Sequence, residues 1–291
     1  MFPLRSAAAP ALLSAPLVHL RDETFDPGQP AAYQLYAVAG PAGLRVAVAD
    51  GARQKIVLLE ETAAPPELLL AEQLAGHELL GQPGWASVRL ALTGRAFTLL
   101  PAPLFRAGDE AVALRLHHPL GPHEMGCHFA HANLDLVSIF AADAGLADWL
   151  RATHGPGSRL LHHTSAVLAG LLQQRGPAAA RRLYLIVGQR ELTLVLLDQQ
   201  RLEFCNVFAF SSAEDVLYYT ILVMQELGLN PDQDELTIWG ELTSDSALFE
   251  LLRTYIRHLR FGSRPYDLQY SYRLNEVLEY QYFDLLSLHF I

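Results

Sequence analysis

Lysine is nearly absent from this sequence: Lys55 is the only one in 291 residues, and the other basic residues are arginines. The 21 basic residues are outnumbered by 31 acidic residues, which gives a formal net charge of -10. Proteins that bind nucleic acids present a basic surface to the phosphates, and long-range repulsion would slow the encounter of this chain with a polyanion. The charge balance therefore predicts that the partner is not a nucleic acid.

Cysteine is also scarce, and long apolar runs are missing. Cys127 and Cys205 lie far apart and form no CxxC pair, which is typical of a reducing compartment rather than of a disulfide scaffold. No apolar run reaches the length of about 18 residues that a membrane span needs. The stretch 1–20 is interrupted by prolines, and its only arginine is Arg5, so it is more typical of a disordered tail than of a secretory signal. These features predict a cytoplasmic protein without a membrane span.

Short catalytic motifs are absent as well. The sequence contains no HExxH, GxSxG or SxxK pattern, no GxxxxGK[ST] phosphate loop and no GxGxxG turn. Cys205 lies among apolar residues of a predicted strand and is expected to be a small core residue rather than a nucleophile. We therefore assign no catalytic residue.

The sequence does contain one pattern of elements that occurs twice. Alternating apolar residues predict three short strands, then a helix and a fourth strand, in each half of the chain. The first copy covers 34–39, 44–49, 55–60, 65–79 and 87–92, and the second covers 183–187, 192–197, 202–210, 212–227 and 236–239. The copies align without a gap at an offset of about 148 residues, which pairs Tyr36, Gly40, Asp50, Arg53 and Glu78 with identical residues. We interpret them as two β-β-β-α-β units.

Other segments connect and extend the two copies. Helices are predicted over 162–174 and over 246–260, and Gly262 is expected to end the second of them. The segment 266–291 interleaves tyrosine and phenylalanine with leucine, so we expect it to dock in a core. A Gly-Pro-Gly cluster at 155–157 marks the predicted boundary between two lobes.

The predicted domains follow from that boundary. A first lobe with a histidine-rich connecting segment covers 1–155, and a second lobe covers 156–291. The sequence leaves open whether the aromatic segment at the end closes the core of this chain or that of another chain. We expect the former.

Histidines cluster between the two copies. Some have the spacing of one helix face, which can chelate zinc or a related ion. The glycines and the proline of the segment disfavour a helix, however, so the favoured interpretation is a surface loop with neutral imidazoles and no bound metal. The residues concerned are His117, His118, His123, Cys127, His128 and His131.

Some polar residues of the second copy have two interpretations. Glu214 and Asp215 either complement the dipole at the start of a helix, where Ser211 or Ser212 is the expected cap, or face a cleft between the lobes. Asn206 lies in an apolar strand, where it either satisfies a backbone group or lines that cleft.

The duplicated unit is the arrangement of the actin-like superfamily, in which the two copies form facing lobes. Over nearly its full length the chain also resembles a bacterial family known as domain of unknown function 3822. The resemblance implies an α/β (α+β) protein with a two-lobed actin-like (ribonuclease H-like) fold. It rests on Phe97–Pro101, Leu104, Phe105, Leu202–Phe204, Asn206, Phe208, Glu214, Asp215, Tyr218, Tyr219, Tyr255 and Ile256.

In actin-like ATPases the turn between the first two strands of each lobe wraps a nucleotide phosphate. An aspartate at the end of the first strand precedes a glycine-bearing turn. The corresponding residues here are Val38 and Ala39 before Gly40, and Ile186 and Val187 before Gly188. Both expected carboxylates are therefore replaced by apolar side chains.

The other parts of a nucleotide site are equivocal. Glu191 lies where a phosphate would approach the second turn, although Arg190 could bind an anion, and only Gly240 stands where a paired-glycine turn is usual. Phosphoryl transfer needs a metal ion and positioned donors, because its transition state is stabilised electrostatically. We predict no cofactor, with ATP and magnesium as the alternative. In that case the residues nearest the nucleotide would be Gly40, Gly43, Gly188, Arg190 and Gly240.

The resemblance therefore implies a degenerate ATPase. We predict a non-catalytic binding or scaffold module whose partner is another protein, and the alternative is an ATP-binding or ATP-hydrolysing protein with unusual phosphate turns. This functional prediction rests on analogy between folds.

Overall fold

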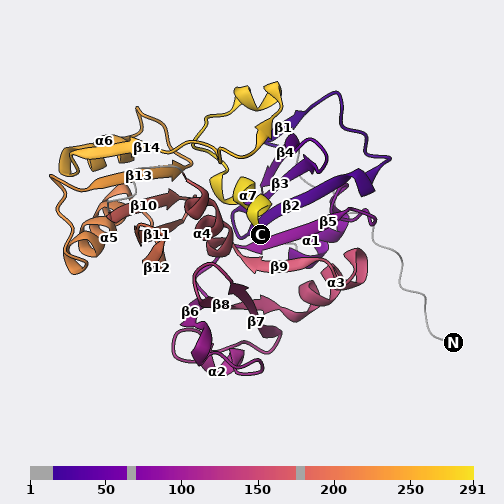
Figure 1. Ribbon diagram of the computed structural model, residues 1–291, viewed down its shortest axis with the longest axis horizontal. Helices are drawn as coiled ribbons and strands as arrows, with labels where there is room; N and C mark the ends of the chain where they lie inside the picture. The colour runs from indigo at the N-terminus through magenta and orange to yellow at the C-terminus, as the bar shows by residue number, and fades with distance from the viewer. Residues whose placement is uncertain (1–15, 64–69, 175–180) are drawn as a thin grey trace.

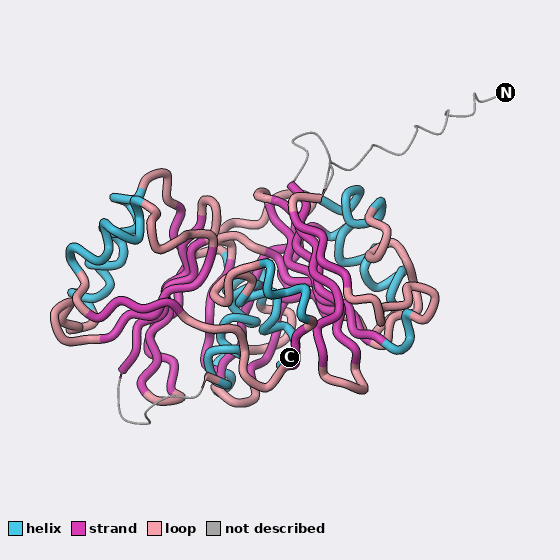
Figure 2. The backbone as a smooth tube through the Cα atoms, turned by 90° about the horizontal axis from the view of Figure 1, so that it is seen from above, coloured by secondary structure: helices cyan, strands magenta, loops and turns pink. Residues whose placement is uncertain are grey.

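The computed structural model describes residues 16–63, 70–174 and 181–291, and Figures 1 and 2 show two large sheets side by side with helices outside and between them. The disordered tail was predicted over 1–20, and residues 1–15 of it lie outside the described residues. The prediction was wrong for the last part, because Val18 begins a strand. No helix in the described ranges is long and apolar enough to cross a membrane.

The first sheet contains the first predicted unit. Its strands in spatial order are β1 (Val18–Arg21), β4 (Lys55–Ala63), β3 (Gly43–Asp50), β2 (Tyr33–Gly40), β5 (Ser87–Leu92) and β9 (Arg159–His162). A short strand near the end of the chain, β15 (Gln269–Tyr270), pairs in parallel with β4. Since β9 belongs to this sheet and β15 returns to it, the stretches 1–155 and 156–291 do not coincide with the two sheets.

The second sheet contains the second unit. Its strands in spatial order are β12 (Arg201–Ala209), β11 (Glu191–Asp198), β10 (Arg181–Val187), β13 (Glu235–Gly240) and β14 (His258–Phe261). Helices α5 (Ala213–Glu226) and α6 (Ala247–Tyr255) pack on this sheet through an apolar cluster that includes Val216 and Leu252.

The internal repeat is confirmed by pairing and by register. Each sheet has an antiparallel meander, β4-β3-β2 or β12-β11-β10, whose last strand pairs in parallel with β5 or β13. A bulge follows Val48 in β3, and a bulge follows Leu196 in β11, which is 148 residues further along the chain. The same alternation of apolar residues therefore produces the same strand geometry twice.

A third, smaller sheet lies between β5 and β9 in the sequence. It has the order β6 (Phe97–Pro101), β8 (Leu136–Asp143) and β7 (Glu124–His131). Helix α2 (Glu110–Leu114) covers it, and α3 (Ala144–His154) leads back toward β9. The histidine-rich segment is thus a loop only before β7, so the prediction of a loop was wrong for Glu124–His131.

Two helices fill the space between the large sheets. Helix α4 (His163–Gln173) places Ala166 in the core of the first sheet, while Val167, Leu168 and Leu171 contact the second. The short helix α7 (Phe283–Ser287) packs beside α4 (Figure 1), and the two approach closely at Gly170. A Cβ atom on Gly170 would come within 2.0 Å of Ser287 Oγ, so only glycine allows this contact.

Two predicted helices differ from those observed. The helix predicted over 246–260 ends at Tyr255, and residues 258–261 form β14 instead. Leu259 and Phe261 alternate with exposed residues, which is the period of a strand. Because Leu259 also fits the apolar face of the preceding helix, the sequence pattern did not reveal this strand. Gly262 does not end a helix; it leaves room for the ring of Trp239, which a Cβ atom would meet at 1.9 Å.

The helix of the first unit ends earlier than predicted. In the described residues α1 covers Leu70–Gly76, and the start of the helix predicted over 65–79 lies outside them. His77 terminates the helix, because its Nδ1 accepts hydrogen bonds from the backbone amides of Leu79 and Leu80 at 3.2 and 3.4 Å.

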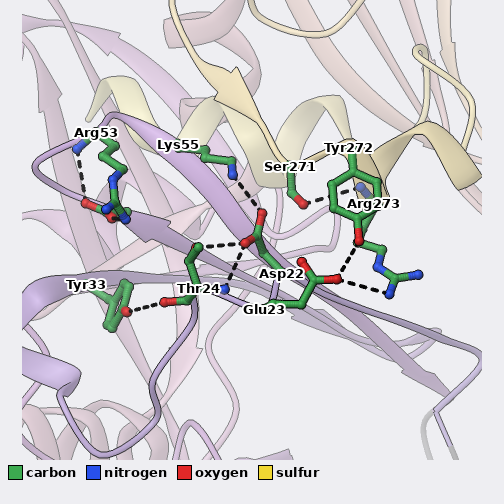
Figure 3. Close-up of polar contacts among 10 residues, drawn as sticks. Asp22, Glu23, Thr24, Tyr33, Arg53, Lys55, Ser271, Tyr272 and Arg273 are labelled. Atoms are coloured by element: carbon green, nitrogen blue, oxygen red, sulfur yellow. Dashed lines mark hydrogen bonds and ion pairs between the residues drawn. The ribbon is translucent and has the colours of Figure 1, made fainter.

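The end of the chain is tied to the first sheet by a polar cluster. Figure 3 shows Lys55, Thr24 and Ser271 around the carboxylate of Asp22, with Lys55 Nζ 2.7 Å from Asp22 Oδ2. Burial would raise the pKa of Asp22, but the hydrogen bonds from Lys55, Ser271 and Thr24 together hold it below its usual range. The single lysine therefore helps to anchor the end of the chain to the first sheet.

The docking of the last segment predicts a large cost for removing its buried side chains. Leu285→Ala should lower the free energy of unfolding by about 2–5 kcal/mol, because Leu285 is fully buried. Leu278→Ala, at a residue 41% exposed, should cost less than about 0.5 kcal/mol. Urea denaturation measures both, and a truncation after Asn275 should give insoluble protein. A soluble, monomeric truncated chain would show that the segment belongs to an interface instead.

Candidate functional site

The residues predicted to surround a nucleotide lie at the ends of strands in both large sheets. Gly40 and Gly43 pair across the β2–β3 turn, and a Cβ atom on Gly40 would come within 1.8 Å of Thr93 Oγ1. The Gly188 amide donates to the carbonyl of Glu191 at 2.9 Å and closes the β10–β11 turn, where Arg190 is exposed. Both turns are tight hairpins.

Gly240 lies at the end of β13 against the last segment of the chain. Its amide donates to the carbonyl of Tyr280 at 2.9 Å, and its φ of 123° is one that favours glycine. A Cβ atom there would come within 1.9 Å of the Val187 carbonyl oxygen. Gly240 therefore permits a close approach between backbones of this chain.

An ion pair near these turns joins the first sheet to α7. Arg45 follows Gly43 by two residues in β3, and Asp284 lies in the first turn of α7. The guanidinium donates through both terminal nitrogens, from Nη1 to Oδ1 at 3.1 Å and from Nη2 to Oδ2 at 2.7 Å. The side chains are 21% and 6% exposed, so this two-pronged pair is largely shielded from water.

Two more carboxylates face Arg45. Glu61 in β4 accepts a hydrogen bond from the hydroxyl of Tyr282 at 2.6 Å. Glu241 follows Gly240, and its pKa is raised, first by burial and then by the nearby charges of Glu61 and Asp284, against the opposing effect of Arg45. Three carboxylates thus lie close to one guanidinium, so the region between the β2–β3 and β10–β11 turns is acidic.

Aromatic contacts support the same junction. The ring of Phe283 in α7 lies 4.5 Å from that of Trp239 in β13, and the ring of Tyr280 stacks on Phe261 of β14 at 4.0 Å. The segment that carries Asp284 is therefore held by the second sheet while it pairs with Arg45 of the first.

A second polar contact between the sheets lies at the start of α4. His163 Nε2 is 3.0 Å from Thr193 Oγ1 in β11, and its Nδ1 is 3.4 Å from the carbonyl oxygen of Leu92. Burial lowers the pKa of His163 to about 4, so its ring is neutral at pH 7. Next to it, His162 Nε2 is 2.9 Å from the carbonyl oxygen of Gly94.

Glu191 makes a further polar contact between the two sheets, with Gly94 and Arg95. Burial raises the pKa of Glu191, while the charge of Arg95 and a hydrogen bond from the Gly94 backbone act in the opposite direction. The carboxylate that the sequence places at the second turn therefore faces residues that follow β5 of the first sheet.

These residues do not fit a metal-bound triphosphate. Phosphate binding uses free amides and cations, but Arg45 is engaged by Asp284, and the carboxylates of Glu61 and Glu241 also lie close to it. Val38, Ala39, Ile186 and Val187, where carboxylates are expected in actin-like ATPases, are all buried apolar side chains. Among the candidate residues only Arg190 presents an exposed cation.

The sequence reasoning identified the glycines but missed Arg45, Asp284, Glu241 and the two buried histidines. Arg45 and Asp284 are 239 residues apart, so no local pattern connects them. His162 and His163 offered one signal in the sequence, since two adjacent histidines stand at the start of a helix whose later residues are mostly apolar.

The other polar candidates have structural roles. Ser212 is the cap of α5: its hydroxyl accepts from the Asp215 amide, and the carboxylate of Asp215 accepts in return from the Ser212 amide. Glu214 is exposed at the same helix start. The side-chain oxygen of Asn206 accepts from the Val207 amide at 2.9 Å, which confirms the interpretation that it satisfies a backbone group.

The histidines of the predicted cluster do not converge on one point, and those in β7 follow the geometry of a strand. His128 Nδ1 is 2.8 Å from Glu110 Oε1, His118 Nε2 is 3.0 Å from Glu124 Oε2, and His131 is buried against Ser138. Successive residues of a strand point to opposite faces, so helical chelate spacing does not apply to β7. The described part of the chain contains no group of three or more His, Cys, Asp or Glu side chains that could hold a metal ion.

Comparisons with known proteins agree with this architecture. Residues 22–259 match the model of a family described as a protein of unknown function (DUF3822). A Bacteroides thetaiotaomicron protein with an actin-like ATPase fold and unknown function aligns with a TM-score of 0.77 and 17% identity, over 91% of this chain and 98% of that one.

A second solved structure is the PilM-PilN type IV pilus biogenesis complex. It aligns with a TM-score of 0.56 and 16% identity, over 90% of this chain and 98% of that chain. At these identities the likeness shows the fold, which is that of actin-like ATPases. No match to a curated protein was found.

The charge cluster predicts that removing its cation is costly and dependent on pH. Arg45→Met should lower the free energy of unfolding by about 3 kcal/mol at pH 7, because it leaves the shielded carboxylate of Asp284 without an opposite charge. The loss should be smaller at pH 5. Burial raises the pKa of Glu241 and Arg45 opposes this shift, so without the guanidinium the native Glu241 holds its proton more tightly than in the unfolded chain, and the stability of the variant rises as the pH falls.

Arg53→Met provides the matched control for this experiment. Arg53 pairs with Asp50 at 3.0 Å but is 63% exposed, so its loss should cost less than about 1 kcal/mol at either pH. Equal costs for the two variants in urea denaturation, or a cost for Arg45→Met that is the same at both pH values, would contradict this description of the cluster.

Buried His163 predicts acid sensitivity in a defined range. Its folded pKa of about 4 is below the usual value, so the unfolded state takes up its proton first and stability is lost as the pH falls from about 6.5 to 4. His163→Gln should make this loss smaller, by as much as about 3 kcal/mol. His123→Gln, at an exposed residue, should leave the slope unchanged. Chemical denaturation at several pH values tests this, and equal slopes for wild type and His163→Gln would refute it.

Proposed function

The chain belongs to the DUF3822 family of proteins of unknown function, and from this premise we propose that it is a non-catalytic binding or scaffold protein of the cytoplasm. In this proposal the actin-like ATPase fold has lost its nucleotide chemistry. What remains is a rigid pair of lobes that presents surfaces to another protein.

The observation that carries the proposal is the pair between Arg45 and Asp284. A guanidinium near the phosphate turns is the group that would stabilise bound phosphate, but here it is neutralised by a carboxylate of the same chain at 2.7 Å. A nucleotide would have to displace this carboxylate and then approach Glu61 and Glu241. That exchange costs a shielded ion pair and adds repulsion, so it is unfavourable.

The fixed contacts between the lobes support the same proposal. Helices α4 and α7 pack against the cores of both sheets, and His163 at the start of α4 bonds to Thr193 of the second sheet. The PilM structure is that of a complex with PilN, which supports the proposal that the partner of this chain is also a protein.

A thermal-shift titration distinguishes this proposal from the ATP-binding alternative. We expect no change in melting temperature with ATP or ADP at about 5 mM, with or without magnesium. A nucleotide bound with a Kd of about 0.1 mM would stabilise the native state by about 2 kcal/mol and raise Tm by several degrees.

A clear magnesium-dependent shift would overturn the proposal. It would call for an ATPase assay on the wild type and on Arg190→Ala and Gly188→Ala, because these residues lie at the exposed second turn. If the shift occurs without magnesium and equally with inorganic phosphate, it reports anion binding at Arg190 rather than recognition of a nucleotide, and Arg190→Ala should abolish it.

A further inference from the structure

The small three-stranded sheet borders a cleft of about 370 Å³, which is within the size range of binding pockets. One wall is the first half of β7, from Met125 to His128. The other walls are α3, through Leu150 and Arg151, and the segment 155–160 that leads into β9. In Figure 1, β7 lies on the side of its sheet that is turned toward α3.

The cleft runs along an open edge of the sheet. The strand order is β6-β8-β7, and no strand in the described part of the chain pairs with the outer edge of β7. Four consecutive residues of β7, 125–128, line the cleft. Successive side chains point to opposite faces, so a cleft lined by all four follows the edge of β7, and β9, which contacts β7, contributes Leu160 to its lining.

The walls of the cleft combine apolar and polar side chains, and one of the polar groups is a cation. Met125, Leu150 and Leu160 supply apolar surface. Glu110 is engaged with His128 at 2.8 Å, whereas Arg151 has no ion-pair partner among the described residues. A ligand with apolar side chains and one carboxylate would complement this cleft.

We propose that β7 receives an extended segment of a partner protein as an additional strand, with alternate apolar side chains in the cleft and a carboxylate opposite Arg151. Backbone hydrogen bonds to the strand edge would give affinity, and the cleft would give specificity. This site rests on the proposed function only in that it supplies a surface for the protein partner.

Composition disfavours the chain's own first 15 residues as the occupant. They contain no acidic residue to face Arg151, their one charged side chain is Arg5, and they include prolines, which cannot donate to a strand edge. The same small sheet and its helix also expose large aliphatic side chains that could contact the rest of a partner. These are Leu104, Val112, Leu116 and Met125, which are 38–87% exposed.

Selection from a random library of peptides about 12 residues long tests the proposal on the full chain. The selected peptides should carry apolar residues at alternate positions and at least one Asp or Glu. In fluorescence anisotropy Arg151→Glu should weaken the best peptide about tenfold. Arg257→Glu, at an exposed arginine of the second lobe, should change its affinity less than about twofold. Hydrogen exchange should show protection by the peptide at 124–131 and 155–160.

Protection elsewhere, equal effects of the two arginine variants, or failure to select any peptide would overturn the proposal. It would also be overturned if β7 is protected without peptide in a concentration-dependent manner, which indicates a second copy, or if deleting residues 1–15 removes existing protection. The nucleotide titration is independent of this site. A peptide that binds at β7 of a protein stabilised by magnesium-ATP would refute the proposed loss of nucleotide binding and leave the peptide site standing.

Discussion

The burial of α7 between the two large sheets is the constraint on which the rest of the structure depends. Each sheet has an apolar face that must be covered, and α7 contributes Phe283 to one core and Leu285 to the other. A helix in that position also brings Asp284 to Arg45 and the backbone of Tyr280 to Gly240. Packing and charge therefore favour the same relation between the lobes.

The proposed loss of nucleotide binding rests on the same relation between the lobes. In such a fold the phosphate turns need a cation and free amides, and here the carboxylate of Asp284 satisfies the cation from within the chain. The apolar Val38 and Ile186 then complete the strands without the carboxylates that a metal ion would require. The two features support the same proposal, since each of them disfavours a bound phosphate.

Much of this fold can be predicted from the sequence, because alternation of apolar residues acts locally. The strands of both units, their offset and the cap at Ser212 are confirmed. Where two local patterns compete, prediction fails: Leu259 fits a helical face, but pairing with β13 determines its conformation. Only part of the candidate site could be predicted from the sequence. Glycines mark turns in any sequence, whereas the partnership of Arg45 with Asp284 exists only after the chain has folded back on itself.

Native-state hydrogen exchange of the wild-type chain, with and without magnesium-ATP, tests the central claim most directly. If α7 stays packed between the lobes in the native state, its amides should exchange only through global unfolding, at a rate that nucleotide does not change. Exchange of α7 through a smaller, local opening, with a rate altered by magnesium-ATP, would contradict the account, because it would show that the helix moves when a nucleotide binds.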